Sequence, residues 1–88
     1  MSTIPDRVRK AANDPQLKVT IRVGKSGISD SLVAEIDSQL ANRDIVKIKA
    51  NKGLFDSSGK KEVWKYLCEK TASKLVVARG NIAVLWRV

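Results

Sequence analysis

The chain has no histidine and only one cysteine among its 88 residues. Histidine is the most common general acid or base in enzymes and a frequent metal ligand, so its absence removes the usual basis for both roles. A zinc site made from thiolates needs several cysteines, and one cysteine cannot form a disulfide within the chain. We therefore expect no enzymatic activity, no metal site, no cofactor and no small-molecule substrate.

Long apolar segments are also absent. No run in the sequence approaches the roughly 20 apolar residues that a helix needs to span a bilayer. The first residues, from Met1 to Arg7, lack the charged and then apolar arrangement of a secretion signal. These features predict a cytoplasmic protein that does not insert into a membrane.

Aromatic residues are few: the chain has one phenylalanine, one tyrosine and two tryptophans. Trp64 and Trp86 fall at core positions of the hydrophobic pattern. Tyr66 is interpreted as an ordinary surface tyrosine, and the alternative is an exposed ring on which a base stacks. The aromatic sheet positions of an RNA recognition motif are not found in the sequence. Any nucleic acid should therefore be bound through its backbone and shape more than through stacking on rings.

Basic residues, in contrast, are in excess. The chain has 17 lysines and arginines against nine aspartates and glutamates, which gives a formal net charge of +8. Such a charge suits an anionic partner, which can be nucleic acid, an acidic protein or an anionic membrane. Nucleic acid is favoured because the charge coincides with a loop suited to phosphate and with one face of the predicted strands.

Alternating and helical hydrophobic patterns succeed one another along the chain and predict its secondary structure. The predicted elements are a helix ending at residue 13, a strand over 18–23, a helix over 30–42, a strand over 45–50, a helix over 59–73 and strands over 74–79 and 82–87. Gly80-Asn81 joins the last two strands as a hairpin turn.

The order α-β-α-β-α-β-β predicts an α/β (α+β) two-layer sandwich with a mixed four-stranded sheet. Helices between the first three strands imply right-handed crossovers, so these strands should be partly parallel. Alternation in the first two strands indicates that one sheet face is buried and the other is wet. We therefore expect the helices to lie on one face.

Residues Gly24, Lys25, Ser26 and Gly27 form a Gly-x-x-Gly loop between the first strand and the next helix. Glycine permits close approach of the backbone to a ligand, and phosphate is favoured at a helix N-terminus by geometry and by the helix dipole. The motif alone is weak, and a plain strand-to-helix turn is the alternative. It is not a nucleotide-hydrolysing P-loop, because that motif reads G-x-x-x-x-G-K-[ST] and Gly27 is followed by Ile28-Ser29. It is also not a dinucleotide-binding fingerprint, because the third glycine is missing.

Further basic side chains extend from the wet face of the predicted strands toward this loop. They are Arg22 on the first strand, Lys47 and Lys49 on the second strand, and Lys52 just after it. Because parallel strands end at the same edge of a sheet, these cations are expected to form a phosphate-binding track with Lys25. An ordinary solvated face is the alternative.

Four segments together resemble a known family: residues 17–28, Glu35-Ile36, Val46-Lys47-Ile48-Lys49 and Ile82-Ala83-Val84-Leu85-Trp86-Arg87. The family is the chloroplast RNA splicing and ribosome maturation (CRM) domain, whose single-domain prokaryotic members are called YhbY-like. The resemblance implies a fold like the C-terminal domain of translation initiation factor three. It also implies that residues 24–27 grip the RNA backbone, as the Gly-x-x-Gly loop of KH domains does.

The resemblance also suggests a biological setting. Bacterial relatives are associated with precursors of the large ribosomal subunit, and plant multidomain relatives with intron splicing. The chain departs from the family at Thr71-Ala72-Ser73, where a glycine-containing segment usually precedes the third strand.

We therefore expect residues 1–88 to form one non-enzymatic RNA-binding domain that binds ribosomal RNA during assembly of the large subunit. One alternative is a small basic chromatin-type protein that binds double-stranded DNA. Another is a protein-interaction module of the translation apparatus. The sequence leaves the oligomeric state open.

Overall fold

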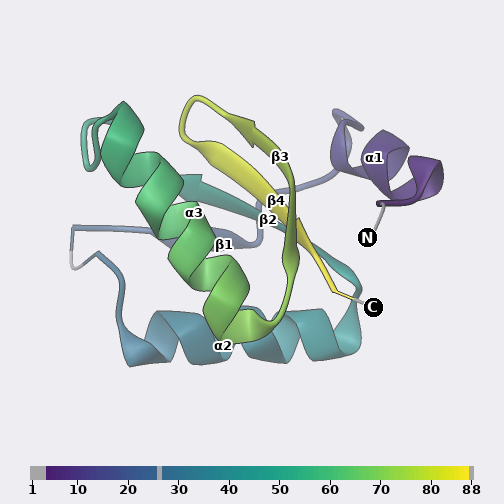
Figure 1. The fold of residues 1–88 in the computed structure, drawn as a ribbon, viewed down its shortest axis with the longest axis horizontal. Coiled ribbons are helices and arrows are strands. Elements are labelled where there is room, and N and C mark those ends of the chain that lie inside the picture. Colours follow the sequence, from purple (N-terminus) through teal and green to yellow (C-terminus); the bar gives the residue numbers. More distant parts are fainter. Residues whose placement is uncertain (1–3, 26, 88) are drawn as a thin grey trace.

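The computed structural model describes residues 4–25 and 27–87 and has the predicted order of elements (Figure 1). The elements are α1 (Asp6–Ala12), β1 (Ile21–Val23), α2 (Asp30–Asn42), β2 (Ile45–Ala50), α3 (Ser57–Thr71), β3 (Lys74–Arg79) and β4 (Ile82–Trp86). The third helix begins and ends two residues before its predicted bounds, and the first strand is three residues long instead of six. Ser26, which was predicted to belong to the loop, lies outside the described residues.

The four strands form one mixed sheet in the order β1-β2-β4-β3. The strands β1 and β2 are parallel, and β4 runs antiparallel to both of its neighbours. The last strand along the chain is therefore central, whereas β1 and β3 are the edges. This arrangement confirms the predicted mixed four-stranded sheet.

The first strand is shorter than predicted, and the chain before it contacts β2 through two single hydrogen bonds. Thr20 N–H donates to the Lys47 carbonyl at 3.1 Å, just outside the bounds of β1. Further back, the Leu17 carbonyl accepts from Lys47 Nζ at 3.1 Å. The alternating pattern over residues 18–20 therefore extends beyond the regular strand, which begins at Ile21.

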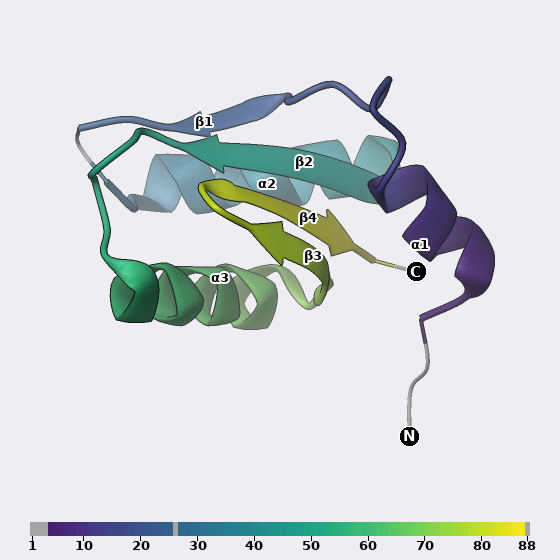
Figure 2. The same ribbon diagram turned by 90° about the horizontal axis from the view of Figure 1, so that it is seen from above.

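Helices α2 and α3 pack against each other and cover one face of the sheet, which holds the main hydrophobic core (Figures 1 and 2). The buried members of this core are Ile21, Val23, Ile36, Leu40, Val46, Ile48, Ala50, Trp64, Leu67, Ala83 and Leu85. The strand members recur at every second position, as expected for side chains on a single face of a sheet. Both tryptophans are buried, as predicted.

Helix α1 packs on the opposite face of the sheet, where no helix was predicted. It contacts β2 and β3, and its Val8 and Ala12 are buried. On β4, Val84 and Trp86 are also buried but lie outside the main core, because they alternate with Ala83 and point to the other face. A thin apolar stripe on α1 therefore covers part of the face that was expected to be wet.

Side-chain caps define the starts of the two long helices. Ser29 Oγ accepts from Leu32 N–H at 3.2 Å at the start of α2, and Asp56 Oδ1 accepts from Gly59 N–H at 2.6 Å at the start of α3. Each cap satisfies a backbone donor that the helix itself leaves unpaired. Within the described ranges, no helix has the length and apolar character needed to cross a bilayer.

Candidate nucleic-acid interface

Three turns meet at one end of the sheet. Because β1 and β2 are parallel, Val23 and Ala50 end side by side, and Asn51 N–H donates to the Val23 carbonyl at 3.0 Å. Ala50 N–H donates to the Asn81 carbonyl at 2.8 Å, which brings the β3–β4 turn to the same place. We call this end, formed by residues 24–27, 51–53 and 80–81, the loop edge; Figure 2 shows all three turns on one side of the molecule.

A row of basic side chains crosses the sheet next to the loop edge. Strand register places Arg22 beside Lys49, Lys49 beside Ile82, and Ile82 beside Arg79. Arg22, Lys49 and Ile82 alternate with core residues on their strands and therefore lie on the face opposite to α2 and α3. Arg79 shares this face because it pairs with Ile82. Arg22, Lys49 and Arg79 are exposed. We call these three residues the cross-strand row.

Arg79 is a member of the row that sequence reasoning missed. The hydrophobic pattern placed it in a strand next to a hairpin, but not beside Lys49. Its position follows only from the strand order, because β4 lies between β2 and β3. The predicted hairpin was the available signal. Arg79 just before its turn pairs with Ile82 just after it, so both residues lie at the same end of the sheet.

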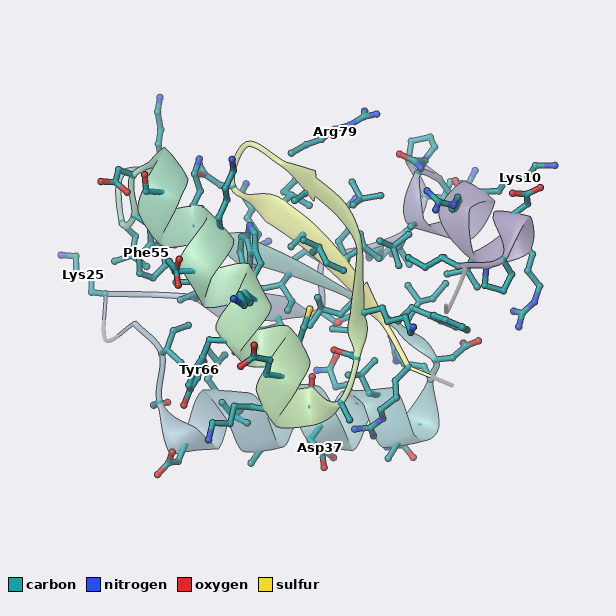
Figure 3. The ribbon with its side chains drawn as sticks, viewed as in Figure 1. Lys10, Lys25, Asp37, Phe55, Tyr66 and Arg79 are labelled. Atoms are coloured by element: carbon teal, nitrogen blue, oxygen red, sulfur yellow. The ribbon has the colours of Figure 1, made fainter. Side chains whose placement is uncertain are left out.

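The 24–27 turn is closed by a hydrogen bond from Gly27 N–H to the Gly24 carbonyl at 2.9 Å. Lys25 is exposed at its tip and extends away from the sheet (Figure 3). Gly27 has a φ of 70°, a left-handed conformation that favours glycine. Gly24 does not have a positive φ, and a Cβ built there meets no described atom within 4 Å. Nothing described in the protein itself requires glycine at position 24, which leaves room for close approach of a ligand.

Two backbone donors near this turn are already used within the chain. Gly27 N–H is bound to Gly24, and Leu32 N–H of the first turn of α2 is bound to Ser29 Oγ. Helix α2 begins at Asp30, so the turn precedes the helix N-terminus by several residues. These two amides are therefore not free to bind an anion, whereas the Lys25 side chain is exposed.

The two other basic residues predicted for the site, Lys47 and Lys52, lie in different surroundings. Lys52 is exposed in the turn after β2 and belongs to the loop edge. Lys47 is half-buried, and its ammonium donates to the Leu17 carbonyl. It lies beside Val84, at the region that α1 covers, so it does not continue the open row as predicted.

The cations of the loop edge and of the cross-strand row have no close acidic partner among residues 4–25 and 27–87. The ion pairs in that part of the chain are Arg7 with Asp44, at 3.8 Å, and Arg87 with Asp37. Neither pair includes Lys25, Lys52 or a member of the cross-strand row. The positive charge of the loop edge is therefore available to an anion from outside the protein.

The described residues show no constellation typical of metal or thiol chemistry. They include no group of three or more cysteine, aspartate and glutamate side chains placed to hold a metal ion. Burial raises the pKa of the Cys68 thiol above its ordinary value of 9.0, although a hydrogen bond with Ser73 opposes this effect. Cys68 is thus protonated near neutral pH and is a weak nucleophile.

Comparison with known proteins identifies the family. The model of the CRS1/YhbY (CRM) domain matches residues 6–87, which include every helix and strand described above. The chain therefore belongs to the CRM domain family, and the resemblance found in the sequence is confirmed.

Two similar proteins are described as candidate RNA-binding proteins. One, from Methanocaldococcus jannaschii, is 30% identical over 71 residues, which cover 81% of this chain and 52% of that protein. The chain thus spans about half the length of this curated relative. The other is a Staphylococcus aureus protein with a solution structure; it is 30% identical, with a TM-score of 0.71 over 83% of this chain and 74% of that one.

Proposed function

We propose that this chain is an RNA-binding module that holds the phosphate backbone of ribosomal RNA at the loop edge and acts in assembly of the large ribosomal subunit. The observation that carries the proposal is the convergence of the 24–27 turn and the cross-strand row at one end of the sheet. Family membership and the two similar proteins, both described as candidate RNA-binding proteins, support it.

The roles of the residues follow from their chemistry. Lys25 offers a mobile ammonium at the tip of the turn, and Gly24 lets a phosphate approach the backbone closely. Arg22, Lys49 and Arg79 extend the cationic surface across the sheet. The guanidinium groups of Arg22 and Arg79 can bind phosphate with two parallel hydrogen bonds, and Lys49 adds an ammonium. Lys52 adds a fifth cation at the adjacent turn.

Binding of this kind needs no catalytic group, and we propose a non-enzymatic role in the cytoplasm. Contacts to phosphate position a nucleic acid but carry no sequence information directly. Selectivity for ribosomal RNA would then come from the shape of a folded RNA segment and from the geometry of its single-stranded parts.

The test is to measure the affinity of the chain for a transcribed fragment of large-subunit ribosomal RNA and for duplex DNA of equal length, at the same salt concentration. We expect tighter binding to the RNA. Replacing Lys25 with glutamine should weaken RNA binding and reduce the slope of log K against log salt by about 1, because one phosphate contact is lost.

The matched control is Lys10→Gln, which removes the same charge from α1, at the opposite end of the molecule from Lys25 (Figure 3). Lys10→Gln should leave the salt slope nearly unchanged. Equal affinity for RNA and duplex DNA would favour a chromatin-type protein instead. Equal effects of the two lysine substitutions would remove the 24–27 turn from the mechanism.

A further inference from the structure

A groove lies directly beside the 24–27 turn, between the chain that leaves the turn and helix α3. Its volume is about 430 Å³, and it is lined by Ile28, Glu62, Val63 and Tyr66. A volume of about 300–1,000 Å³ is usual for sites that hold small organic groups. Ile28 follows Gly27 directly, so one wall of the groove is the next residue of the chain after the proposed phosphate site.

Tyr66 forms an exposed wall of this groove. Trp64 and Leu67 on the same helix are buried against the sheet, whereas Tyr66 is 40% exposed. Figure 3 shows its side chain between α3 and the start of α2. Lys70 Nζ lies over the ring, 5.6 Å from its centroid, so it covers only one of the two ring faces. The other face is left for stacking by a flat group.

Glu62 is the charged residue in the lining of the groove, and its chemistry limits which ligands can bind there. Glu62 is an acid, and its ionised carboxylate accepts hydrogen bonds but cannot donate them. It repels a phosphate but can accept from an amino group. Ile28 and Val63 supply apolar contacts, which suit a flat base and not a charged backbone.

We propose that this groove binds one unpaired RNA base that carries an exocyclic amino group. The base stacks on Tyr66, and its amino group donates to Glu62. Cytosine, adenine and guanine have such a group, whereas uracil presents an oxygen at the corresponding position of cytosine. The inference rests on the proposed function, because the phosphate next to this base is the one held at the 24–27 turn. It also changes the interpretation of Tyr66 from an ordinary surface residue to a contact for a base.

The experiment uses two fluorescent RNA decamers, one of uridine alone and one with a central cytidine. The unmodified protein should bind the cytidine decamer more tightly. Tyr66→Ala should weaken that binding about tenfold, within the usual range for the loss of one stacked base. Tyr66→Phe should stay within about twofold, because the ring is kept. Glu62→Gln should reduce the difference between the two decamers.

A second measurement locates the base. A decamer with 5-iodocytidine at its centre should crosslink to Tyr66 under ultraviolet light, and the crosslinked residue can be identified by mass spectrometry. Leu75→Ala is the matched control, because Leu75 is 39% exposed on β3 and does not line the groove. It should leave both affinities and the crosslink unchanged.

The outcomes separate this inference from the proposed function. If Lys25→Gln weakens binding to both decamers but Tyr66→Ala does not, the groove has no role and the backbone site stands. If the unmodified protein binds no RNA of any kind, both proposals fall. Equal affinity for the two decamers, with no crosslink at Tyr66, also overturns the inference.

Discussion

The two glycines of the 24–27 turn meet different requirements. Gly27 has a φ of 70°, which a residue with a Cβ adopts only with strain, whereas Gly24 has no positive φ and open space around it. The backbone conformation of the turn therefore favours glycine at position 27 but does not require it at position 24. This difference separates the stability of the turn from its proposed binding role.

Alanine substitutions should therefore have different effects at these two positions. Gly27→Ala should lower the free energy of unfolding by up to about 1 kcal/mol, because the strain of alanine in the left-handed region exceeds what its smaller freedom in the unfolded chain offsets. Gly24→Ala should change stability by less than about 0.5 kcal/mol but weaken RNA binding, because the added methyl group keeps a phosphate away from the backbone. Urea unfolding and RNA titration of both variants measure the two effects. A Gly24→Ala variant with normal RNA affinity would show that close approach at this position is not needed.

Alternating patterns were enough to predict the exposed positions of Arg22 and Lys49, because each lies between two core residues on its strand. The same patterns did not predict that Lys47 is half-buried, with its ammonium donating to the Leu17 carbonyl. That contact depends on how residues far apart in the sequence meet. Arg79 was missed for a similar reason, since its neighbour across the sheet depends on the strand order.

Among the helices, α3 shows how one element serves two purposes. One of its sides enters the core through Trp64 and Leu67, and another lines the groove through Val63 and Tyr66. Helical spacing predicted the core side correctly. It could not predict the groove, because Ile28, on the opposite wall, comes from a loop. Helix α1 was also predicted, but its short apolar stripe does not indicate which sheet face it covers.

The end of α3 contains the departure from the family pattern. Ala72 is its C-cap and has a φ of 51°, which places a non-glycine residue in the left-handed region. Glycine is the usual residue at such a helix end because it has no Cβ. The missing glycine in Thr71-Ala72-Ser73 therefore has a local cost to stability.

Replacing Ala72 with glycine should stabilise the protein. Relief of left-handed strain is worth about 1–2 kcal/mol, and the greater freedom of glycine in the unfolded chain offsets about 0.5–1 kcal/mol of it. We expect a net gain of up to about 1 kcal/mol in the free energy of unfolding, measured by urea titration. Ala78→Gly is the control, because Ala78 is an exposed residue inside β3, where glycine should destabilise. A loss of stability in Ala72→Gly would contradict this account.

At the scale of the whole molecule, the net charge of +8 includes a group of cations at one end of the sheet. Lys25 and Lys52 of the loop edge and the three residues of the cross-strand row have no close acidic partner among the described residues. Such a group of cations attracts an anionic polymer toward this end of the protein.

Salt should therefore weaken RNA binding strongly. If each of the five cations of the loop edge and the cross-strand row neutralises one phosphate of a single strand, the slope of log K against log salt is about −3.5. Titrations of the ribosomal RNA fragment at several potassium chloride concentrations measure it. An affinity that does not change with salt would contradict the electrostatic basis of the proposal.

The width of the cross-strand row sets the length of RNA that the proposed site spans. Neighbouring strands lie about 4.8 Å apart, so the distance from Arg22 on one edge strand to Arg79 on the other is about 14 Å. At about 3.4 Å per nucleotide, as in a stacked strand, this width matches roughly four nucleotides. Helix α1 covers another part of the same face, against β2 and β3. In the proposed mode of binding, the row of each domain therefore contacts a short stretch of RNA, and a long RNA can accommodate several copies side by side.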